Sequence, residues 1–338
     1  MKKRIAVFCA GDSSEREVSV NSTLNVVKNL DYQKFEPYLV VIEGTNWFVI
    51  PCVNLYTVGE FTLQSVLEHK GAGQIDKTDF TYQGQGFAAA LIMIHGTPGE
   101  NGLLQGYLEM MKIPFTTCSS FVSAITFDKH SCKRFLDYAG VKMAADTYIR
   151  KDVPYSKREI IRQVGLPMFV KPTIGGSSFG VTKVKTEEEL EAALESAFKE
   201  CDTIIAEAAI KGREMTNGIF KHKGTIYKLP VTEIITKREF FDYEAKYLGE
   251  SDEICPAEIS EELASKIQNL SERIYSFMGC NGVVRMDYIV DENEDVYFLE
   301  VNTVPGMTLM SLIPNMLKVQ GIAVTDFLTM LIEDAIKE

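Results

Sequence analysis

The sequence has no long apolar run. None of its hydrophobic stretches approaches the roughly 18 residues that a membrane-spanning helix needs, so we expect no membrane segment. The N-terminus is basic over Met1–Arg4, but the apolar stretch Ile5–Ala10 that follows is too short for a secretory signal.

An excess of basic residues is also missing. The chain has 35 Lys+Arg against 47 Asp+Glu, which gives a formal net charge of −12. Proteins that bind nucleic acid usually carry a basic surface, so we expect no nucleic-acid partner. A few local lysines could still dominate one cleft and bind an anionic substrate.

Cysteines with metal-binding or redox spacing are absent as well. The chain has seven cysteines, an odd number, and no C-x-x-C pair. Isolated thiols are usually small buried hydrophobic residues, so we expect no zinc site, a reducing compartment and a soluble cytoplasmic protein. The seven are Cys9, Cys52, Cys118, Cys132, Cys201, Cys255 and Cys280.

The remaining composition is that of a globular protein, with 338 residues, 46% hydrophobic and 24% charged. At about 150 residues per domain the length suggests two domains, but the pattern favours three. Buried strands that alternate with helices predict an open α/β sheet first, with ligands at the strand C-terminal ends. The C-terminal half alternates as antiparallel strands and helices, which indicates α+β structure. We expect domains at residues 1–122, 123–213 and 214–338.

Three local features follow from the pattern. Ser14 and Glu17 fit a capping box at the start of the first helix. A single helix is predicted from about Ser120 to Tyr138. Residues 238–257 lack a clear period and predict a long loop, and such loops are uncommon unless they act as lids or are disordered. Lys246 and Tyr247 lie in this loop and could close over a phosphate, although a mobile surface loop is the alternative.

A predicted hairpin near the C-terminus carries the sharpest chemical pattern. Period-two alternation puts Arg285 and Asp287 on one face of the first strand, and Glu300 and Asn302 on one face of the second. If residues 291 and 296 pair across the turn, Asp287 faces Glu300 and Arg285 faces Asn302. Opposed carboxylates destabilise a sheet unless something offsets them, and Mg²⁺ with its preference for oxygen ligands would do so. A solvated sheet face with an Arg–Asp salt bridge is the alternative.

Two further segments are rich in glycine. Lys171–Gly180 lies between two predicted strands and could lay backbone N–H groups over phosphates, with Lys171 as a point charge. It is not a Walker A loop, because the spacing differs and no helix follows, and a plain β-turn is the alternative. His95–Gly102 indicates close backbone approach to a partner. Glu15 begins the first helix, where an acid also commonly complements the helix dipole.

Taken in order, these motifs resemble one family, the D-alanine-D-alanine ligases of the ATP-grasp superfamily. The matching segments run from near the N-terminus almost to the C-terminus: Ser14-Glu-Arg-Glu-Val-Ser19, His95-Gly-x-x-Gly-Glu-x-Gly-x-x-Gln-Gly106, Lys171-Pro-x-x-x-Gly-Ser-Ser-x-Gly180, Gly212-x-Glu214, Tyr243-Glu-Ala-Lys-Tyr247, Arg285-x-Asp287, Glu300-x-Asn302 and Pro305-Gly-Met-Thr-x-x-Ser311-Leu312.

The resemblance implies a three-domain ATP-grasp fold in which two antiparallel sheets hold ATP. It implies ATP-dependent joining of two D-alanines through a D-alanyl phosphate, with ADP and phosphate released, for peptidoglycan precursor synthesis. It also implies two Mg²⁺ ions, with Mn²⁺ possible, and a homodimer. Phosphoryl transfer mainly needs positioning and charge neutralisation, which fits a site built from lysine, arginine and metal.

The resemblance also assigns roles to individual residues. Those implied to act in catalysis are Glu15, Ser177, Tyr247, Arg285 and Gly306, with Glu15, Ser177 and Tyr247 forming one hydrogen-bonded set. Those implied to bind the D-alanines are His95, Ser311 and Leu312. Those implied to contact the nucleotide are Lys129, Lys171, Glu207, Ile210, Glu214 and Lys246. The implied metal ligands are Asp287, Glu300 and Asn302, with Glu300 bridging two ions.

Two alternatives stay open at this point. The chain could be a related ligase that makes D-alanyl-D-lactate or uses D-serine, although Tyr247 and Leu312 match the D-alanine pattern. It could also bind nucleotide without turnover, although all four hairpin residues are intact. A substrate panel separates the first alternative, and D-alanine-dependent ATP hydrolysis separates the second.

Overall fold

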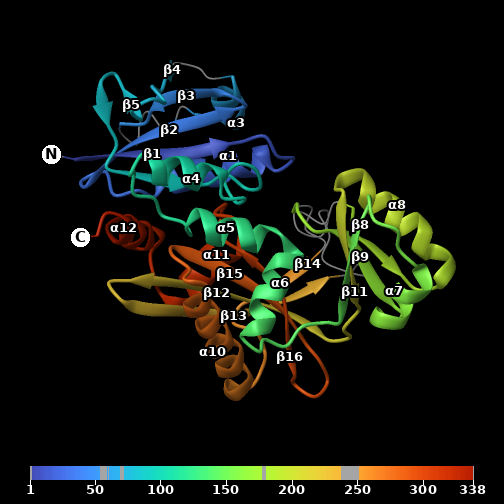
Figure 1. Ribbon diagram of the computed structural model, residues 1–338. Coiled ribbons are helices and arrows are strands. Elements are labelled where there is room, and N and C mark those ends of the chain that lie inside the picture. Colours follow the sequence, from blue (N-terminus) through green and yellow to red (C-terminus); the bar gives the residue numbers. More distant parts are fainter. Residues whose placement is uncertain are drawn as a thin grey trace.

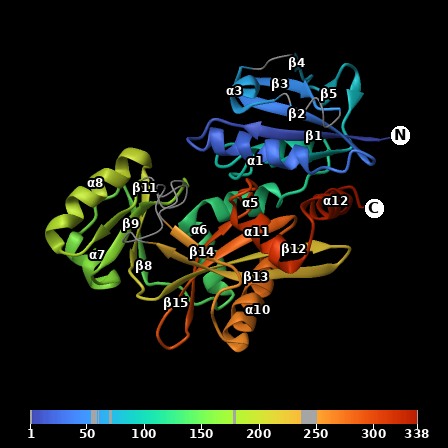
Figure 2. The same cartoon turned by 180° about the vertical axis from the view of Figure 1, so that it is seen from behind.

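The computed structural model describes residues 2–53, 59, 61–68, 72–176, 180–236 and 251–337. Three larger sheets organise this part of the chain (Figures 1 and 2). In Figure 1 the first sheet is blue and lies at the top, while the second, in yellow-green, lies beside the third, in gold and red. None of the helices in the described part is long and apolar enough to cross a membrane.

The first sheet has the order β4-β3-β2-β1-β7, with β1 parallel to both β2 and β7. Its central strands are continuous apolar runs, as expected for strands covered on both faces. Residues 5–10 of β1 have no solvent exposure. The elements of this region are β1 (Lys3–Ala10), α1 (Arg16–Lys28), β2 (Phe35–Glu43), β3 (Asn46–Pro51), α3 (Leu63–Leu67), β4 (Gly73–Gln74), β5 (Thr81–Tyr82), β6 (Gln85–Gly86), β7 (Ala89–Ile92) and α4 (Leu103–Met110).

The predicted capping box at the start of α1 is wrong. The helix begins at Arg16, and its N-cap residue Glu15 makes no side-chain cap. The hydroxyl of Ser13 accepts a hydrogen bond from the Glu15 N–H at 3.2 Å and donates one to the carbonyl oxygen of His95 at 2.7 Å. Ser13 therefore links the start of α1 to the segment after β7, and the Glu15 side chain takes no part in capping the helix.

The helix predicted from residue 120 to 138 is two helices, α5 (Ser120–Phe127) and α6 (Lys129–Tyr138). Asp128 has an extended backbone, and its carboxylate accepts a hydrogen bond from the Ser131 N–H at 2.7 Å. An Asp cap of this kind starts a new helix without interrupting the apolar pattern, which explains the error. The break puts Lys129 at the first position of α6.

The second sheet is antiparallel and has the order β10-β9-β11-β8. Helices α7 and α8 pack on one face around a separate apolar cluster. The elements are β8 (Asp146–Arg150), α7 (Lys157–Val164), β9 (Met168–Pro172), β10 (Thr182–Val184), the 3₁₀ turn η1 (Glu187–Glu189), α8 (Leu190–Glu200) and β11 (Thr203–Ala208). The other face is turned toward the third sheet (Figure 1).

The third sheet is antiparallel and has the order β14-β13-β12-β15-β16. Its elements are β12 (Arg213–His222), β13 (Thr225–Thr236), β14 (Ser251–Ile254), β15 (Val283–Val290) and β16 (Val296–Asn302). The loop prediction for 238–257 is therefore wrong at 251–254, because β14 pairs there with β13. Residues 238–250 lie outside the described residues.

Three helices complete the C-terminal region: α10 (Glu261–Met278), α11 (Leu312–Gln320) and α12 (Val324–Ala335). Helix α10 covers the face of the third sheet that carries Met286 and Tyr288. Helices α11 and α12 join the other face to the first sheet, and one apolar cluster runs from β1 and α1 into both helices. This shared core fixes the first sheet over the third.

Candidate active site

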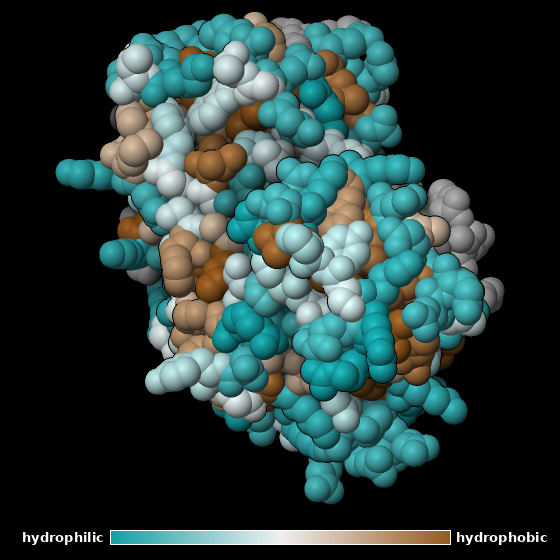
Figure 3. Space-filling view, turned by 45° about the vertical axis from the view of Figure 1, so that its right-hand side comes forward, coloured by the Kyte–Doolittle hydropathy of each residue, from teal (hydrophilic) through white to brown (hydrophobic). Residues whose placement is uncertain are grey.

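A cavity of about 770 Å³ lies where the three sheets meet. Its walls come from the start of α1, the segments after β7 and β9, the inner faces of the second and third sheets, and the start of α11. Figure 3 shows the surface of the molecule from one side, mostly polar with apolar side chains in scattered patches. The cavity instead gathers polar and charged side chains from segments far apart in the sequence.

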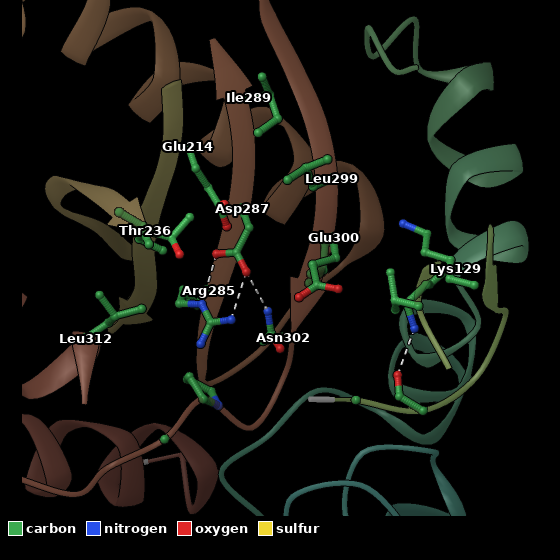
Figure 4. Close-up of a pocket in the computed structure, with 18 of the residues that line it drawn as sticks. Lys129, Glu214, Thr236, Arg285, Asp287, Ile289, Leu299, Glu300, Asn302 and Leu312 are labelled. Atoms are coloured by element: carbon green, nitrogen blue, oxygen red, sulfur yellow. Dashed lines mark hydrogen bonds and ion pairs between the residues drawn. The ribbon is translucent and has the colours of Figure 1, made fainter. Parts of the chain in front are cut away.

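The β15–β16 hairpin forms one wall, and the predicted pairs are confirmed. Asp287 pairs with Glu300, and Arg285 pairs with Asn302. The Arg285 guanidinium donates two hydrogen bonds to Asp287, from Nε at 2.9 Å and from Nη2 at 2.8 Å. Thr216 on β12 donates to Asp287 Oδ1 at 2.6 Å, and Asn302 Nδ2 donates to Oδ2 at 3.2 Å. Figure 4 shows the four hairpin side chains, Arg285, Asp287, Glu300 and Asn302, on one face of the hairpin.

The predicted pair that flanks the hairpin turn is wrong by one residue. Val290, not Asp291, pairs with Val296, so the turn is one residue longer than expected. A bulge at Leu299 restores the register before Glu300. The bulge also puts Leu299 on the cavity wall, beside the face that carries the carboxylates (Figure 4).

The chemistry of this donor set fits Mg²⁺. Asp287, Glu300 and Asn302 offer carboxylate and amide oxygens on one face. In the described part of the chain there is no cluster of three or more His, Cys, Asp or Glu side chains that would hold a metal unaided. Mg²⁺ is usually bound by one or two carboxylates together with substrate phosphates, which is what this face can offer.

The opposite wall carries lysines. The Lys129 ammonium donates to the carbonyl oxygen of Gly175 at 2.7 Å, and the Lys129 N–H donates to the carbonyl oxygen of Thr173 at 2.8 Å. Lys171 on β9 forms an ion pair with Glu207 on β11. Figure 4 shows Lys129 facing the acidic hairpin across the cavity. An anionic substrate would lie between the lysine side chains of one wall and the oxygen atoms of the other wall that suit a metal ion.

Charge pairing keeps Glu207 and Lys171 ionised. Burial alone would raise the pKa of Glu207, but Lys171 and Lys133 next to it bring that pKa down to about 2. Burial would lower the pKa of Lys171, but the Glu207 carboxylate overcomes this and raises it. Both side chains are therefore charged at neutral pH.

The first sheet contributes Glu15 and His95. His95 is buried, with Nε2 3.2 Å from the Ser22 hydroxyl and Nδ1 2.9 Å from the carbonyl oxygen of Val304. Burial lowers the pKa of His95, so the ring favours its neutral form. A Cβ at Gly176 would lie 2.9 Å from Glu15 Oε2, so the Glu15 carboxylate reaches the glycine-rich segment after β9.

Sequence reasoning missed Glu100. Its Oε2 accepts a hydrogen bond from the Gly96 N–H at 2.7 Å, and it lines the cavity with His95. Burial, with a further contribution from the charge of Glu15, raises the pKa of Glu100 to about 8. Glu100 lies inside the His95–Gly106 motif, but the motif alone does not reveal that this side chain is half-buried in the cavity wall.

The segment before α11 forms another part of the cavity wall. The Ser311 hydroxyl accepts from the Thr308 N–H at 3.0 Å, and a Cβ at Gly306 would lie 2.9 Å from that hydroxyl. Leu312 is buried and faces the cavity from the first turn of α11 (Figure 4). Ile210 and Glu214 also line the cavity.

The cavity thus brings together most of the predicted site residues: Glu15, His95, Lys129, Lys171, Glu207, Ile210, Glu214, Arg285, Asp287, Glu300, Asn302, Gly306, Ser311 and Leu312. Ser177, Lys246 and Tyr247 lie outside the described residues. Besides Glu100, the prediction missed Lys183 and Glu253 on the cavity wall and Lys133, which pairs with Glu207 but does not line the cavity, and nothing in their local sequence marks them.

Known proteins resemble the chain over its full length. The family model "D-ala D-ala ligase N-terminus" matches residues 4–118, and "D-ala D-ala ligase C-terminus" matches residues 135–333. The D-alanine–D-alanine ligase of Phocaeicola vulgatus is 42% identical over 338 residues, which cover 99% of each chain. That of Christiangramia forsetii is 42% identical over 342 residues and covers all of both chains.

Solved structures agree with these relatives. The D-alanine-D-alanine ligase from Coxiella burnetii has a TM-score of 0.87 and 26% identity, covering 99% of this chain and 94% of its own. The VanG D-Ala:D-Ser ligase from Enterococcus faecalis has a TM-score of 0.85 and 29% identity, covering 99% and 100%. The predicted ATP-grasp fold class is confirmed, and the chain belongs to the D-alanine–D-alanine ligase family.

Proposed function

We propose that the chain joins two D-alanines into D-alanyl-D-alanine at the expense of ATP, for peptidoglycan precursor synthesis. The observation that carries the proposal is the pairing of Asp287 with Glu300 and of Arg285 with Asn302, opposite the lysine wall. A site with opposed cations and oxygen ligands suits phosphoryl transfer, which depends on positioning and charge neutralisation.

The proposed chemistry has two steps. A carboxylate oxygen of the first D-alanine attacks the γ-phosphorus of ATP, and the bond to the ADP oxygen breaks, which gives D-alanyl phosphate and ADP. The amine of the second D-alanine, after losing a proton, attacks the carbonyl carbon. The carbon–oxygen bond to phosphate then breaks and the peptide bond remains. Phosphorylation is needed because a carboxylate is a poor electrophile.

In this proposal the nucleotide lies between the second and third sheets. Lys129 and Lys171 neutralise phosphate charge from the second sheet, and Lys246 does the same from the segment outside the described residues. Glu214 accepts hydrogen bonds from the ribose. The adenine contacts the segment from Glu207 to Ile210, at the end of β11.

Asp287, Glu300 and Asn302 would hold two Mg²⁺ ions, or Mn²⁺, with Glu300 shared between them. Bound there, the ions would neutralise the negative charge that develops on the phosphates. The bidentate contact from Arg285 already fixes the orientation of the Asp287 carboxylate before any ligand arrives.

Glu15 would bind the ammonium group of the first D-alanine, steadied by Ser177 and Tyr247, and buried His95 would lie near the carboxylate of that substrate. Arg285 and the Gly306 N–H would stabilise the oxyanion that forms when the amine attacks. Ser311 and the start of α11 at Leu312 would receive the carboxylate of the second D-alanine, because a helix N-terminus favours anions.

Three broader expectations belong to the same proposal and rest on the family. They are a division into domains at 1–122, 123–213 and 214–338, a homodimer, and work in the cytoplasm, where ATP is available. Gel filtration with light scattering tests the dimer, and limited proteolysis tests the boundaries near residues 122 and 213.

The direct test is phosphate release from ATP and Mg²⁺ with D-alanine, with L-alanine, and with D-alanine plus D-serine or D-lactate, followed by mass analysis of the products. We expect release with D-alanine alone and a product with the mass of the dipeptide. The panel includes D-serine because a D-Ala:D-Ser ligase is among the structural relatives. Release only with D-serine or D-lactate would reassign the substrate, and ATP binding without release would leave a nucleotide-binding protein.

A further inference from the structure

Lys133 is a buried lysine that the proposed chemistry does not use. It lies on α6, one turn after Lys129, and only 1% of its surface is exposed. Its ammonium donates to the carbonyl oxygen of Ala144 at 3.0 Å and to Glu207 Oε1 at 2.6 Å, and it forms an ion pair with Asp146 Oδ2 at 2.8 Å. Two carboxylates therefore compensate its charge, as a buried ammonium requires.

Glu207 connects Lys133 to the cavity. One carboxylate oxygen of Glu207 accepts from Lys133, and the other forms the ion pair with Lys171. Lys133 does not line the cavity, whereas Lys171 and Glu207 both do. Glu207 is followed directly in the chain by Ala208–Ile210, the segment proposed to contact adenine. Glu207 thus contacts Lys171, which is proposed to bind phosphate, and it directly precedes the segment proposed to bind adenine. Lys133 fixes the position of the Glu207 carboxylate.

Charges of both signs pair within this cluster. Two carboxylates, Asp146 and Glu207, face two buried ammonium groups, Lys133 and Lys171, and Arg134 adds a contact to Asp146 at 2.8 Å. Removing Lys133 would leave Lys171 as the one cation paired with Glu207 in the described part of the chain. Lys171 would then be drawn toward Glu207 and away from an incoming phosphate, because an uncompensated buried carboxylate is costly.

We propose that Lys133 is a positioning residue for the nucleotide. It neutralises and orients Glu207, so that Lys171 is available to phosphate and the segment after β11 is held for adenine. The proposal rests on the proposed function for its ligand. It assigns Lys133 no contact with substrate.

The test measures Mg-ADP affinity by calorimetry, and KM for ATP and for D-alanine, in K133M, D146N and E207Q. Asp146 is the matched control because it touches the same ammonium but not Lys171. We expect K133M to weaken ADP binding and raise KM for ATP at least 10-fold, with KM for D-alanine within 2-fold of wild type. We expect the ADP affinity and the KM for ATP of D146N to stay within 2-fold of the wild-type values.

Two further variants separate positioning from folding. K133M/D146N removes one positive and one negative charge and leaves the net charge of the cluster unchanged, so we expect a melting temperature close to that of wild type together with the ATP defect of K133M. K133M/E207Q should be no worse for ATP than E207Q alone, because Lys133 acts through Glu207. Wild-type nucleotide affinity in K133M/D146N, or additive losses in K133M/E207Q, would overturn the proposal. ADP affinity needs no turnover, so absence of dipeptide in the wild type would count against the proposed function alone.

Discussion

Asp287 and Glu300 lie directly opposite each other on the cavity face of the β15–β16 hairpin. Two carboxylates in this position repel each other in an empty site, and cross-strand pairs of like charge are normally avoided. Arg285 offsets part of the cost through its two hydrogen bonds to Asp287. An arrangement that costs folding energy and faces a cavity is explained by a cation that arrives with the substrate.

Glu300→Gln tests that explanation. The amide keeps the shape of the side chain and removes the charge, so we expect the fold to persist and turnover to fall 100-fold or more, because metal stabilisation of phosphoryl transfer is worth several kcal/mol. Phosphate release measures the loss. Glu292→Gln, an exposed acid in the turn of the same hairpin, is the control. Near-normal turnover in Glu300→Gln would refute the metal assignment.

Glu15→Gln tests the site for the first D-alanine. A hydrogen bond to a charged group contributes about 1.5–3 kcal/mol, so we expect KM for D-alanine to rise by roughly 10- to 100-fold with little change in ADP affinity. Glu17→Gln, an exposed acid in the first turn of α1, should change neither value. An equal effect of both substitutions would mean that the helix dipole, not substrate binding, explains Glu15.

Glu100 predicts a pH dependence of stability. Because its pKa is raised from 4.5 to about 8, the folded state binds more protons than the unfolded state between these values. The free energy of unfolding should therefore fall as pH rises from 4.5 to 8, by up to about 1.4 kcal/mol per pH unit. Glu100→Gln lacks this carboxyl, so urea titrations from pH 5 to 8 should show its stability gaining on that of wild type.

The charge of Glu15 contributes to the raised pKa of Glu100, which supplies a control. In a Glu15→Gln background the pH range over which Glu100→Gln gains on its parent should move to lower pH. Parallel stability curves for wild type and Glu100→Gln would contradict the assigned cause, because burial would then have no effect on that carboxyl.

The sequence predicts the hairpin pairs correctly because strand alternation is local. The faces of Arg285, Asp287, Glu300 and Asn302 follow from period two, and the bulge at Leu299 compensates for the longer turn so that the facing pairs survive. The apolar pattern does not predict the start of α6, because Asp128 interrupts the helix without interrupting that pattern.

The buried charge cluster lies beyond what local patterns can predict. Lys133 and Glu207 are 74 residues apart in the chain, and only the packing of α6 against the second sheet brings their charged atoms to 2.6 Å. The burial of Glu100 is likewise set by tertiary packing. A family resemblance transfers roles to motif residues, but it does not identify the residues that hold those motifs in place.

Gly282→Ala tests how the hairpin is fixed to the first sheet. Gly282 precedes β15 with φ +66°, and a Cβ there would lie 1.9 Å from the carbonyl oxygen of Thr116. Thr116 in turn donates its N–H to Ala90 of β7 at 3.1 Å, so the contact joins the first sheet to the strand that carries Arg285 and Asp287. We expect unfolding free energy, measured in urea, to fall by about 2–4 kcal/mol from backbone strain and overpacking together.

Gly279→Ala separates the two causes. Gly279 has nearly the same φ, +68°, but a Cβ there has nothing within 4 Å, so only the backbone strain of about 1 kcal/mol should appear. Since Gly282→Ala must also push residues 116 and 282 apart, KM for D-alanine should rise in that variant and stay unchanged in Gly279→Ala. Equal urea midpoints for the two variants would show that the close approach at Thr116 does not constrain the site.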